Sequence, residues 1–178
     1  MLAERDFEKI TINSIVSKAG IGRSTFYLHF QDKFDLLNYV SNLIVSELQA
    51  LYQQPGANQS IELFRDHYSH NEPLPSCITI AEHFLKFAGF YRNRLQNNRF
   101  YQELAEGLKV QLIAFYNDDF LASFAAYGTI DIMNQWLEQQ MSMPLREITL
   151  RLTNIGLHSL FGLAAPDERQ ALRVAAHA

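Results

Sequence analysis

The stretch from Thr11 to Lys33, TINSIVSKAGIGRSTFYLHFQDK, constrains the fold more than any other part of the chain. Thr11 is a good helix N-cap, because its hydroxyl can accept a hydrogen bond from a free backbone amide of the first turn. Gly20 lies where a helix favours a left-handed residue at its C-terminal end. Between them, apolar residues recur at helical spacing on one face: Ile12, Ile15, Val16 and Ala19. The pattern predicts a short helix, a tight turn and a second helix.

The second helix differs from an ordinary surface helix in the residues that it would expose. Its apolar side carries Phe26 and Phe30. The residues expected to hold the two helices at a fixed angle are Ile15, Ala19, Ile21 and Phe26. The opposite face is small or polar: Gly22, Arg23, Ser24, Thr25, Tyr27 and His29. A plain αα-hairpin, the alternative interpretation, would use Glu, Lys and Gln on that face. The arrangement is typical of a helix-turn-helix that reads a DNA major groove.

The distribution of charge along the chain, rather than its net value, is compatible with DNA binding. The formal net charge of −4 argues against a general binder of polyanions. From Thr11 to Lys33, however, there are three cations and one anion, so this stretch is locally basic. The sequence therefore indicates a small positive face on an acidic body.

The remaining global features favour a cytoplasmic protein. Cys77 is the only cysteine, which excludes an intrachain disulfide. No apolar run approaches the roughly 18 residues that span a bilayer. The first ten residues, MLAERDFEKI, lack the apolar core of a signal peptide. We therefore expect no membrane association.

The stretch from Ile12 to Leu37, IxxIVxKAGIGRSTFYLHFxDKxxLL, resembles the DNA-binding head of the tetracycline-repressor (TetR) family. That family has an apolar residue and Thr before the first of these helices and Ala-Gly in the turn. It continues with small-Thr-aromatic-Tyr-x-His-Phe and with a Lys that opens the next helix. The matching residues here are Ile10, Thr11, Ala19, Gly20, Ser24, Thr25, Phe26, Tyr27, His29, Phe30 and Lys33.

The resemblance implies DNA contacts for seven residues: Thr11, Arg23, Ser24, Thr25, Tyr27, His29 and Lys33. Three consecutive residues, Arg23, Ser24 and Thr25, would face base edges. A bidentate contact from Arg23 to guanine would contribute about 1–3 kcal/mol of discrimination. The other four would hold the phosphate backbone, which sets register rather than sequence preference. The alternatives are packing on a neighbouring helix for Tyr27 and His29, and helix solvation for Lys33.

The resemblance also predicts the all-α architecture. Only six residues precede Phe7, so the first helix of the three-helix head is expected to be shortened. A long helix from Lys33 to about Gln54 would lead into a larger helical domain, either as a lever or as a plain connection. We expect a DNA-binding domain at 1–45 and a ligand-binding and dimerisation domain at 46–178. Further helices are predicted at 60–70, 78–95, 99–116, 119–141 and 145–163.

Aromatic residues concentrate in two of these helices and are the candidate ligand contacts: Phe84, Phe87, Phe90, Tyr91, Phe100, Tyr101 and Phe115. The family implies a hydrophobic or aromatic inducer here. The alternative is a filled core, since aromatic residues at helical spacing more often pack than bind. The two interpretations stay open from sequence alone.

The last two predicted helices carry the candidate dimer interface. Their sequence, GTIDIMNQWLEQQMSMPLREITLRL, resembles a TetR subgroup that includes regulators of dihydroxyacetone kinase. The family implies a four-helix bundle with the same helices of a second subunit. Candidate contacts are Leu121, Ala125, Gly128, Ile132, Trp136, Leu152, Ile155 and Ser159. Ala125 and Gly128 would allow a second helix to approach closely.

The sequence gives little support for an enzyme. His67 and His70 are near Glu72, and Glu82-His83 is a second acid–imidazole pair, but neither set supplies three converging metal ligands. No nucleophile elbow, phosphate-binding glycine loop or CxxC pair is present. We expect no metal, no cofactor and no catalytic residue.

The combined interpretation is a TetR-type regulator, a repressor that binds palindromic operator DNA as a homodimer under control of a ligand or a partner protein. Two alternatives stay open. One is a dimeric interaction protein whose DNA binding is weakened or lost. The other is an activator that is controlled by a partner protein.

Overall fold

The computed structural model describes residues 7–52, 67 and 70–163, with side chains described as far as residue 156. In these ranges the regular structure is entirely helical, which confirms the predicted all-α class. A short 3-10 helix, η1 (Phe7–Lys9), precedes α1 (Ile12–Ala19), α2 (Arg23–His29) and α3 (Lys33–Tyr52). The rest comprises α5 (Pro75–Lys86), α6 (Ala88–Arg94), α7 (Asn98–Tyr116), α8 (Asp119–Glu138) and α9 (Leu145–Leu163).

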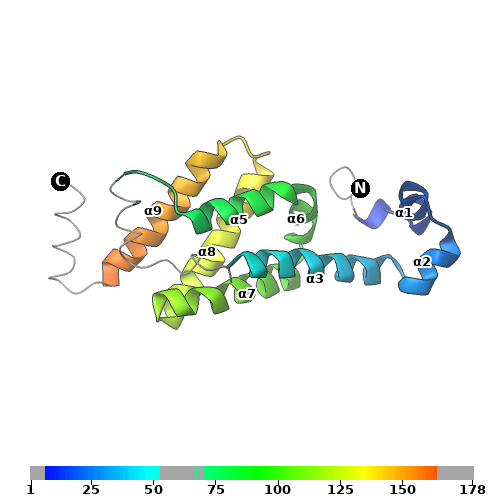
Figure 1. Ribbon diagram of the computed structural model, residues 1–178, viewed down its shortest axis with the longest axis horizontal. Coiled ribbons are helices and arrows are strands. Elements are labelled where there is room, and N and C mark those ends of the chain that lie inside the picture. The colour runs from blue at the N-terminus through cyan, green and yellow to red at the C-terminus, as the bar shows by residue number, and fades with distance from the viewer. Residues whose placement is uncertain (1–6, 53–66, 68–69, 164–178) are drawn as a thin grey trace.

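The molecule has a small head at one end and a larger helical body at the other (Figure 1). In the described part of the chain, α3 is the element that joins them, and it runs as one continuous helix through the expected boundary at residue 45. That boundary stays a prediction. In the body, α7 packs along α8, and α5 packs on α9. A helix of 20 residues is about 30 Å long, so α3 can carry a displacement from the body to the head.

The core is one apolar cluster that extends from the head along α3 into the body. Phe7, Ile10 and Leu37 form its part in the head, whereas α3 supplies Ile44 and Leu48 farther on. Most of the body core comes from α5, α6, α7 and α8, with fully buried Phe84, Tyr91, Ile130 and Met133 among its largest members. The head and the body therefore share packing through α3.

The single helix predicted at 78–95 is wrong, because the chain forms two helices there. α5 begins at Pro75 and ends at Lys86, and Phe87 leaves the helical conformation with φ −111° and ψ 28° before α6 begins. The Phe87 ring packs against His83, with ring centroids 4.9 Å apart, and the Lys86 ammonium lies 4.7 Å from the centroid of the Phe87 ring. The aromatic spacing continues through this break, so periodicity alone could not locate it.

Other helix boundaries agree with the sequence or differ slightly. Asn97 and Asp118 cap α7 and α8, each accepting a hydrogen bond from a first-turn amide. α8 ends at Glu138 rather than Met141, because Gln140 and Met141 adopt positive φ angles. The expected helical segment at 1–7 falls outside the described residues up to residue 6, as does the predicted helix at 60–70 apart from His67 and His70.

No helix in the described ranges is both long enough and apolar enough to cross a membrane.

Candidate functional site

The turn between α1 and α2 has the geometry that the sequence predicts. The Thr11 hydroxyl accepts a hydrogen bond from the Ser14 amide at 3.2 Å, and the Ser14 hydroxyl accepts one from the Thr11 amide at 3.1 Å. This reciprocal capping box satisfies two amides that a helix end would leave unpaired. Gly20 closes α1 in the left-handed conformation, with φ 68°. The helix-turn-helix is therefore defined by local hydrogen bonds.

The residues that hold these helices together differ in part from the prediction. Val16 and Phe26 are the buried residues of α1 and α2, at 7% and 2% exposed surface. Ala19 is exposed and Ile21 is 42% exposed, so their expected role as anchors is wrong. The chain leaves α1 through the left-handed Gly20, and Ile21 follows directly after it.

Arg23 lies at the beginning of α2, and contacts from both helices fix its guanidinium. Its Nη1 donates to Asn13 Oδ1 at 3.1 Å, and its Nη2 donates to the Tyr27 hydroxyl at 3.3 Å. The guanidinium carbon also lies 5.8 Å from the centroid of the Tyr27 ring. A cation held in this way is oriented before any partner arrives, which lowers the entropic cost of binding.

The sequence interpretation did not include Asn13. This residue lies on the first helical turn of α1, ten residues from Arg23, and nothing in the spacing indicates that the two side chains meet. Their contact depends on the angle between α1 and α2. The residue type was the only available signal, since Asn at an exposed helix position can accept a hydrogen bond.

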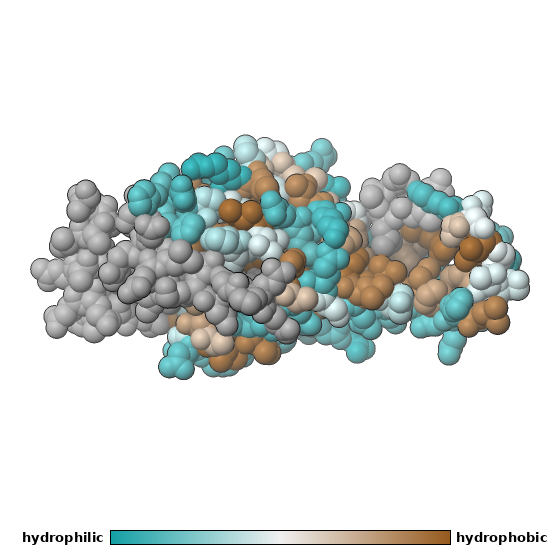
Figure 2. Space-filling view, in the orientation of Figure 1, coloured by the Kyte–Doolittle hydropathy of each residue, from teal (hydrophilic) through white to brown (hydrophobic). Residues whose placement is uncertain are grey.

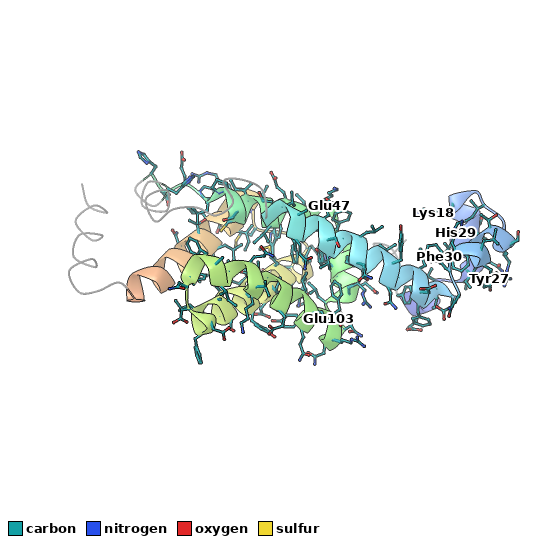
Figure 3. All side chains as sticks on the ribbon, turned by 60° about the horizontal axis from the view of Figure 1, so that its bottom comes forward. Lys18, Tyr27, His29, Phe30, Glu47 and Glu103 are labelled. Atoms are coloured by element: carbon teal, nitrogen blue, oxygen red, sulfur yellow. The ribbon has the colours of Figure 1, made fainter. Side chains whose placement is uncertain are left out.

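The other predicted DNA contacts of α2 lie on one exposed side of the head. Ser24, Thr25 and His29 are exposed, and Tyr27 is 48% exposed while its ring packs edge-on against Phe26. Figure 3 shows Tyr27 at the end of the molecule that is farthest from the body. The structure brings Arg23 and Tyr27 into direct contact, whereas Thr11 is engaged in capping α1.

Lys33 is positioned differently from the other candidates. Its ammonium donates to the carbonyl oxygens of Phe7 and Glu8, both at 3.1 Å, and the side chain is 18% exposed. It also lies 4.8 Å from the Phe7 ring centroid and 5.3 Å from that of Phe34. Lys33 therefore ties η1 to the start of α3. Its predicted phosphate contact would require these bonds to be exchanged.

Most of the predicted ligand contacts form a filled core instead of a pocket. The rings of Phe84 and Tyr91 stack in parallel with centroids 4.0 Å apart, and Phe90 packs edge-on against both Tyr91 and Phe100. Phe87 and Tyr101 are partly buried and pack against this core. Of the seven candidates, Phe115 is the one that lines the apolar cavity described next. The rings fill one another's space, so the other six do not line this cavity, and a ligand contact by any of them stays a prediction.

A cavity of about 290 Å³, partly open to the surface, lies beside this core between α5, α7, α8 and α9. Its walls are mainly apolar, with Leu108, Leu112, Phe115, Ile132 and Leu152 among them. Polar groups come from six further lining residues: Ser76, Cys77, Gln111, Tyr116, Thr129 and Asp131. A largely apolar cavity with a few polar groups is the usual form of a small-molecule site.

Burial keeps two ionisable groups on the cavity wall, Cys77 and Tyr116, in their neutral forms. Burial raises the pKa of the Cys77 thiol to about 11, so the thiol remains protonated and unreactive at neutral pH. Burial also raises the pKa of Tyr116 to about 12, and its hydroxyl lies 3.6 Å from where a Cβ at Gly156 would be. Cys77 and Tyr116 therefore offer neutral hydrogen-bonding groups to the cavity.

One polar cluster connects α5 to α3. Glu47 of α3 forms an ion pair with Lys86 of α5, and Glu47 Oε1 lies 3.9 Å from Nε2 of the buried His83. The Nδ1 of His83 lies 3.2 Å from the Tyr91 hydroxyl. Burial is the main cause that lowers the pKa of His83, and Glu47 opposes it. The acid that faces His83 is thus Glu47 rather than its sequence neighbour Glu82.

The candidate dimer contacts are distributed over three environments. Ala125, Gly128, Ile132, Leu152 and Ile155 line the cavity. Trp136 is buried at 4% and its indole N–H donates to the Met143 carbonyl at 2.9 Å, while Leu121 is partly buried. Ser159 lies outside the described side chains. Trp136 thus packs inside its own subunit and stabilises it.

Exposed apolar side chains nevertheless remain on the body. Figure 2 shows one apolar area at the corner between α7 and α8, where Val110, Phe120 and Phe124 are 63%, 88% and 60% exposed. A second area covers the part of α3 between body and head, where Tyr39 and Leu43 are half-exposed. Apolar surface of this kind is common where another molecule binds.

Within the described residues, no group of three or more His, Cys, Asp or Glu side chains could hold a metal ion. This includes His67, His70 and His83, which the sequence interpretation had considered.

Two protein-family descriptions match the chain. Residues 1–40 match "Bacterial regulatory proteins, tetR family", and residues 71–156 match "Transcriptional regulator C-terminal region". The first match contains the whole α1–turn–α2 unit, and the second contains the cavity and most of the body.

Individual relatives carry consistent names. The HTH-type transcriptional regulator YxbF of Bacillus subtilis (strain 168) is 24% identical over 181 residues, which cover 96% of this chain and 46% of the relative. HTH-type transcriptional regulators of Staphylococcus aureus strains USA300 and NCTC 8325 are each 28% identical over 110 residues, covering 57% of this chain and 55% of the relative. The chain spans about half the length of these relatives.

Proposed function

Because residues 1–40 match the tetR family of bacterial regulatory proteins and residues 71–156 match a transcriptional-regulator C-terminal region, we propose that the chain is a regulator of this family, which binds palindromic operator DNA as a homodimer and represses transcription. In this proposal a ligand or a partner protein acts on the body and releases the DNA. The observation that carries the proposal is Arg23, which Asn13 and Tyr27 hold at the exposed beginning of α2.

The exposed side of α2 supports the DNA-reading part of the proposal. Arg23, Ser24 and Thr25 would reach base edges, and a preoriented guanidinium suits the O6 and N7 atoms of guanine. Tyr27 and His29 would hold phosphates on either side. Thr11 and Lys33, whose side chains cap α1 and brace η1, would contribute by orienting the head and then contact phosphate only secondarily.

A homodimer is supported by the apolar side chains that α8 and α9 leave exposed. Phe124 and Ile155 are 60% and 46% exposed within the subunit. A second copy related by two-fold symmetry would cover them and present two heads to a palindromic site. Light scattering during size-exclusion chromatography should give twice the 20.5 kDa mass of the chain.

Ligand control is supported by the position of α5. Near its beginning α5 contributes Ser76, Cys77 and Ile80 to the cavity wall, and near its end Lys86 is paired with Glu47 of α3. A small, largely apolar ligand that displaced α5 would therefore act on α3 and on the separation of the two heads. The cavity itself contains no α3 residue, so α5 would be the intermediary.

A mobility-shift titration with the DNA upstream of the gene tests the proposal. Arg23→Ala should weaken specific binding by about 1–3 kcal/mol and relax the preference at one base pair of each half-site. Arg151→Ala is the matched control, because Arg151 is an exposed arginine of the body that pairs with Glu147. A uniform loss over all sequences would limit Arg23 to a phosphate contact.

Two alternatives predict different results in the same assay. A dimeric interaction protein with lost DNA binding would give no specific shift at moderate salt. An activator controlled by a partner protein, as the resemblance to dihydroxyacetone-kinase regulators implies, would bind the DNA without being released by a small apolar molecule. An enzyme would be expected only if purified protein held stoichiometric metal. A cytoplasmic location accompanies the proposed function.

A further inference from the structure

A second, polar cleft of about 730 Å³ lies between α3 and the junction of α6 with α7. It is distinct from the apolar cavity, because no residue lines both. Figure 3 shows Glu103, which lines the cleft, and Glu47, which does not, on opposite sides of the α3 ribbon. The cleft therefore borders α3 on the side away from the contact with α5.

The α3 wall of the cleft is rich in neutral hydrogen-bonding groups. Side-chain amides come from Asn38, Asn42 and Gln49, and a hydroxyl comes from Ser46. Ser41 also lines the cleft, but it is buried and its hydroxyl already donates to the Leu37 carbonyl at 2.7 Å. These residues repeat along one side of the helix at intervals of three or four. A wall of amides and hydroxyls favours a ligand with several hydroxyl groups over an apolar one.

Arg94 on the opposite wall has unused hydrogen-bonding capacity. Its guanidinium carbon lies 4.8 Å from the centroid of the buried Phe100 ring, which fixes the plane of the group. Its Nε is inaccessible to solvent and has no hydrogen-bond partner among the described residues. A buried donor without a partner is rare in native structures, and the arginine that carries it lines a cleft large enough for a ligand.

The charges of the cleft leave an excess of one positive charge. Arg99 forms an ion pair with Glu103, with Nε and Oε1 2.8 Å apart. The Glu103 carboxylate also faces Arg94, but it is already paired with Arg99. α7 begins at the cleft, capped by Asn97, and the amino end of a helix attracts anions. Arg94 is thus placed to pair with an anion from outside the chain.

We propose that this cleft binds a small hydroxylated molecule that carries one oxyanion, either a carboxylate or a phosphate ester. Arg94 binds the oxyanion, with Arg99 and the beginning of α7 beside it. The amides and hydroxyls of α3 bind the hydroxyl groups of the ligand. Such a ligand contacts α3 and the body together, at a site separate from the apolar cavity, and its binding does not depend on the proposed DNA activity.

Isothermal titration calorimetry on the full chain at low salt tests this site. The probes are D-gluconate, D-glucose 6-phosphate and, as the uncharged control, D-glucose. We expect at least one anionic probe to bind, and glucose to bind at least about tenfold more weakly. Binding of gluconate alone identifies a carboxylate site, and binding of glucose 6-phosphate alone identifies a phosphate-ester site. No binding of either anionic probe, or equal binding of glucose, overturns the proposal.

Variants localise the binding. Arg94→Gln should lower the affinity for the anionic probe by about tenfold or more, because it removes the charge that pairs with the oxyanion. Arg151→Gln is the control: it alters an exposed arginine of α9 that pairs with Glu147, and it should leave the affinity for the probe unchanged. If Arg94→Gln does not fold, Asn42→Ala on the exposed α3 wall should weaken binding about threefold or more. Unchanged affinity in the folded variants contradicts the assigned site.

Discussion

At the scale of single residues, the most informative contact is the one between Asn13 and Arg23. The guanidinium is held by a neutral amide and a phenol, and neither of these described partners cancels its charge. This leaves the cation available to DNA while restricting its orientation. Asn13 is thus a positioning residue for the proposed base contact.

Asn13→Ala should weaken operator binding about fivefold, because the loss of one hydrogen bond to a charged group frees Arg23 to rotate. Ser17→Ala, on the same exposed helix but without a contact to Arg23, is the control. Quantitative mobility shifts measure both variants. An Asn13→Ala variant with wild-type affinity would show that Arg23 needs no fixation by α1.

Lys33→Met should destabilise the head, because it removes an ammonium that donates to two carbonyl oxygens and lies over two aromatic rings. The expected cost is about 1–3 kcal/mol. Hydrogen exchange of the backbone amides in α1 and α2 measures it.

The salt dependence of DNA binding separates this bracing role from a phosphate contact. If Lys33 only braces the head, the slope of log affinity against log salt stays the same in Lys33→Met. If Lys33 contacts phosphate, the slope decreases by about 0.9 for each phosphate that the variant no longer neutralises. Unchanged hydrogen exchange together with a reduced slope would contradict the bracing role.

Residue roles were predictable from sequence where they depend on neighbours in the chain. The caps at Thr11 and Gly20 are local, and both are confirmed. The contact of Asn13 with Arg23 and that of Lys33 with Phe7 join residues ten or more positions apart. They depend on helix angles, which the apolar pattern does not specify.

At the scale of elements, the α3–α5 junction combines an ion pair with a buried imidazole. Nε2 of His83 is buried without a hydrogen-bond partner among the described residues, and Glu47 lies 3.9 Å away. The groups that face it are Glu47 from α3, Lys86 from its own helix and Tyr91 from α6. Burial lowers the pKa of His83 below its ordinary value of 6.5, so the folded state favours the neutral ring.

The contribution of His83 to stability should therefore be present above about pH 6.5 and be lost as the pH falls below it. The unfolded chain then binds a proton that the folded chain excludes, at a cost of up to about 1.4 kcal/mol per pH unit. Urea unfolding of the wild type and of His83→Gln between about pH 7.5 and 5.5 measures the effect. As the pH is lowered, the free energy of unfolding should fall more steeply for the wild type than for His83→Gln. An equal pH dependence in the two proteins would contradict the neutral form of buried His83.

The helices themselves were largely predictable, and the internal cavity was not. Apolar periodicity and capping residues located α7, α8 and α9 to within a few residues. The same periodicity left open whether the aromatic residues between Phe84 and Phe115 surround a pocket or fill a core. Side-chain spacing cannot distinguish rings that stack on one another from rings that surround a space, and Phe84 and Tyr91 stack. The cavity formed where smaller residues such as Ala125 and Gly128 meet.

At the scale of the whole molecule, the head and the body are at opposite ends of α3 (Figure 1). The apolar cavity reaches α3 through α5, and the polar cleft borders α3 directly. Two ligands of different chemistry could therefore act on one helix from opposite sides. The proposed regulation follows from this arrangement, because any displacement of α3 changes where the head lies.

The central claim is that two heads of a symmetric dimer bind one palindromic operator. Hydroxyl-radical footprinting of the upstream DNA tests it most directly. The account predicts two protected half-sites of inverted sequence, with centres separated by about one helical turn or a multiple of it, and Arg23→Ala should need a higher protein concentration to protect both. Absence of protection at moderate salt, or a single half-site without its inverted partner, would contradict it.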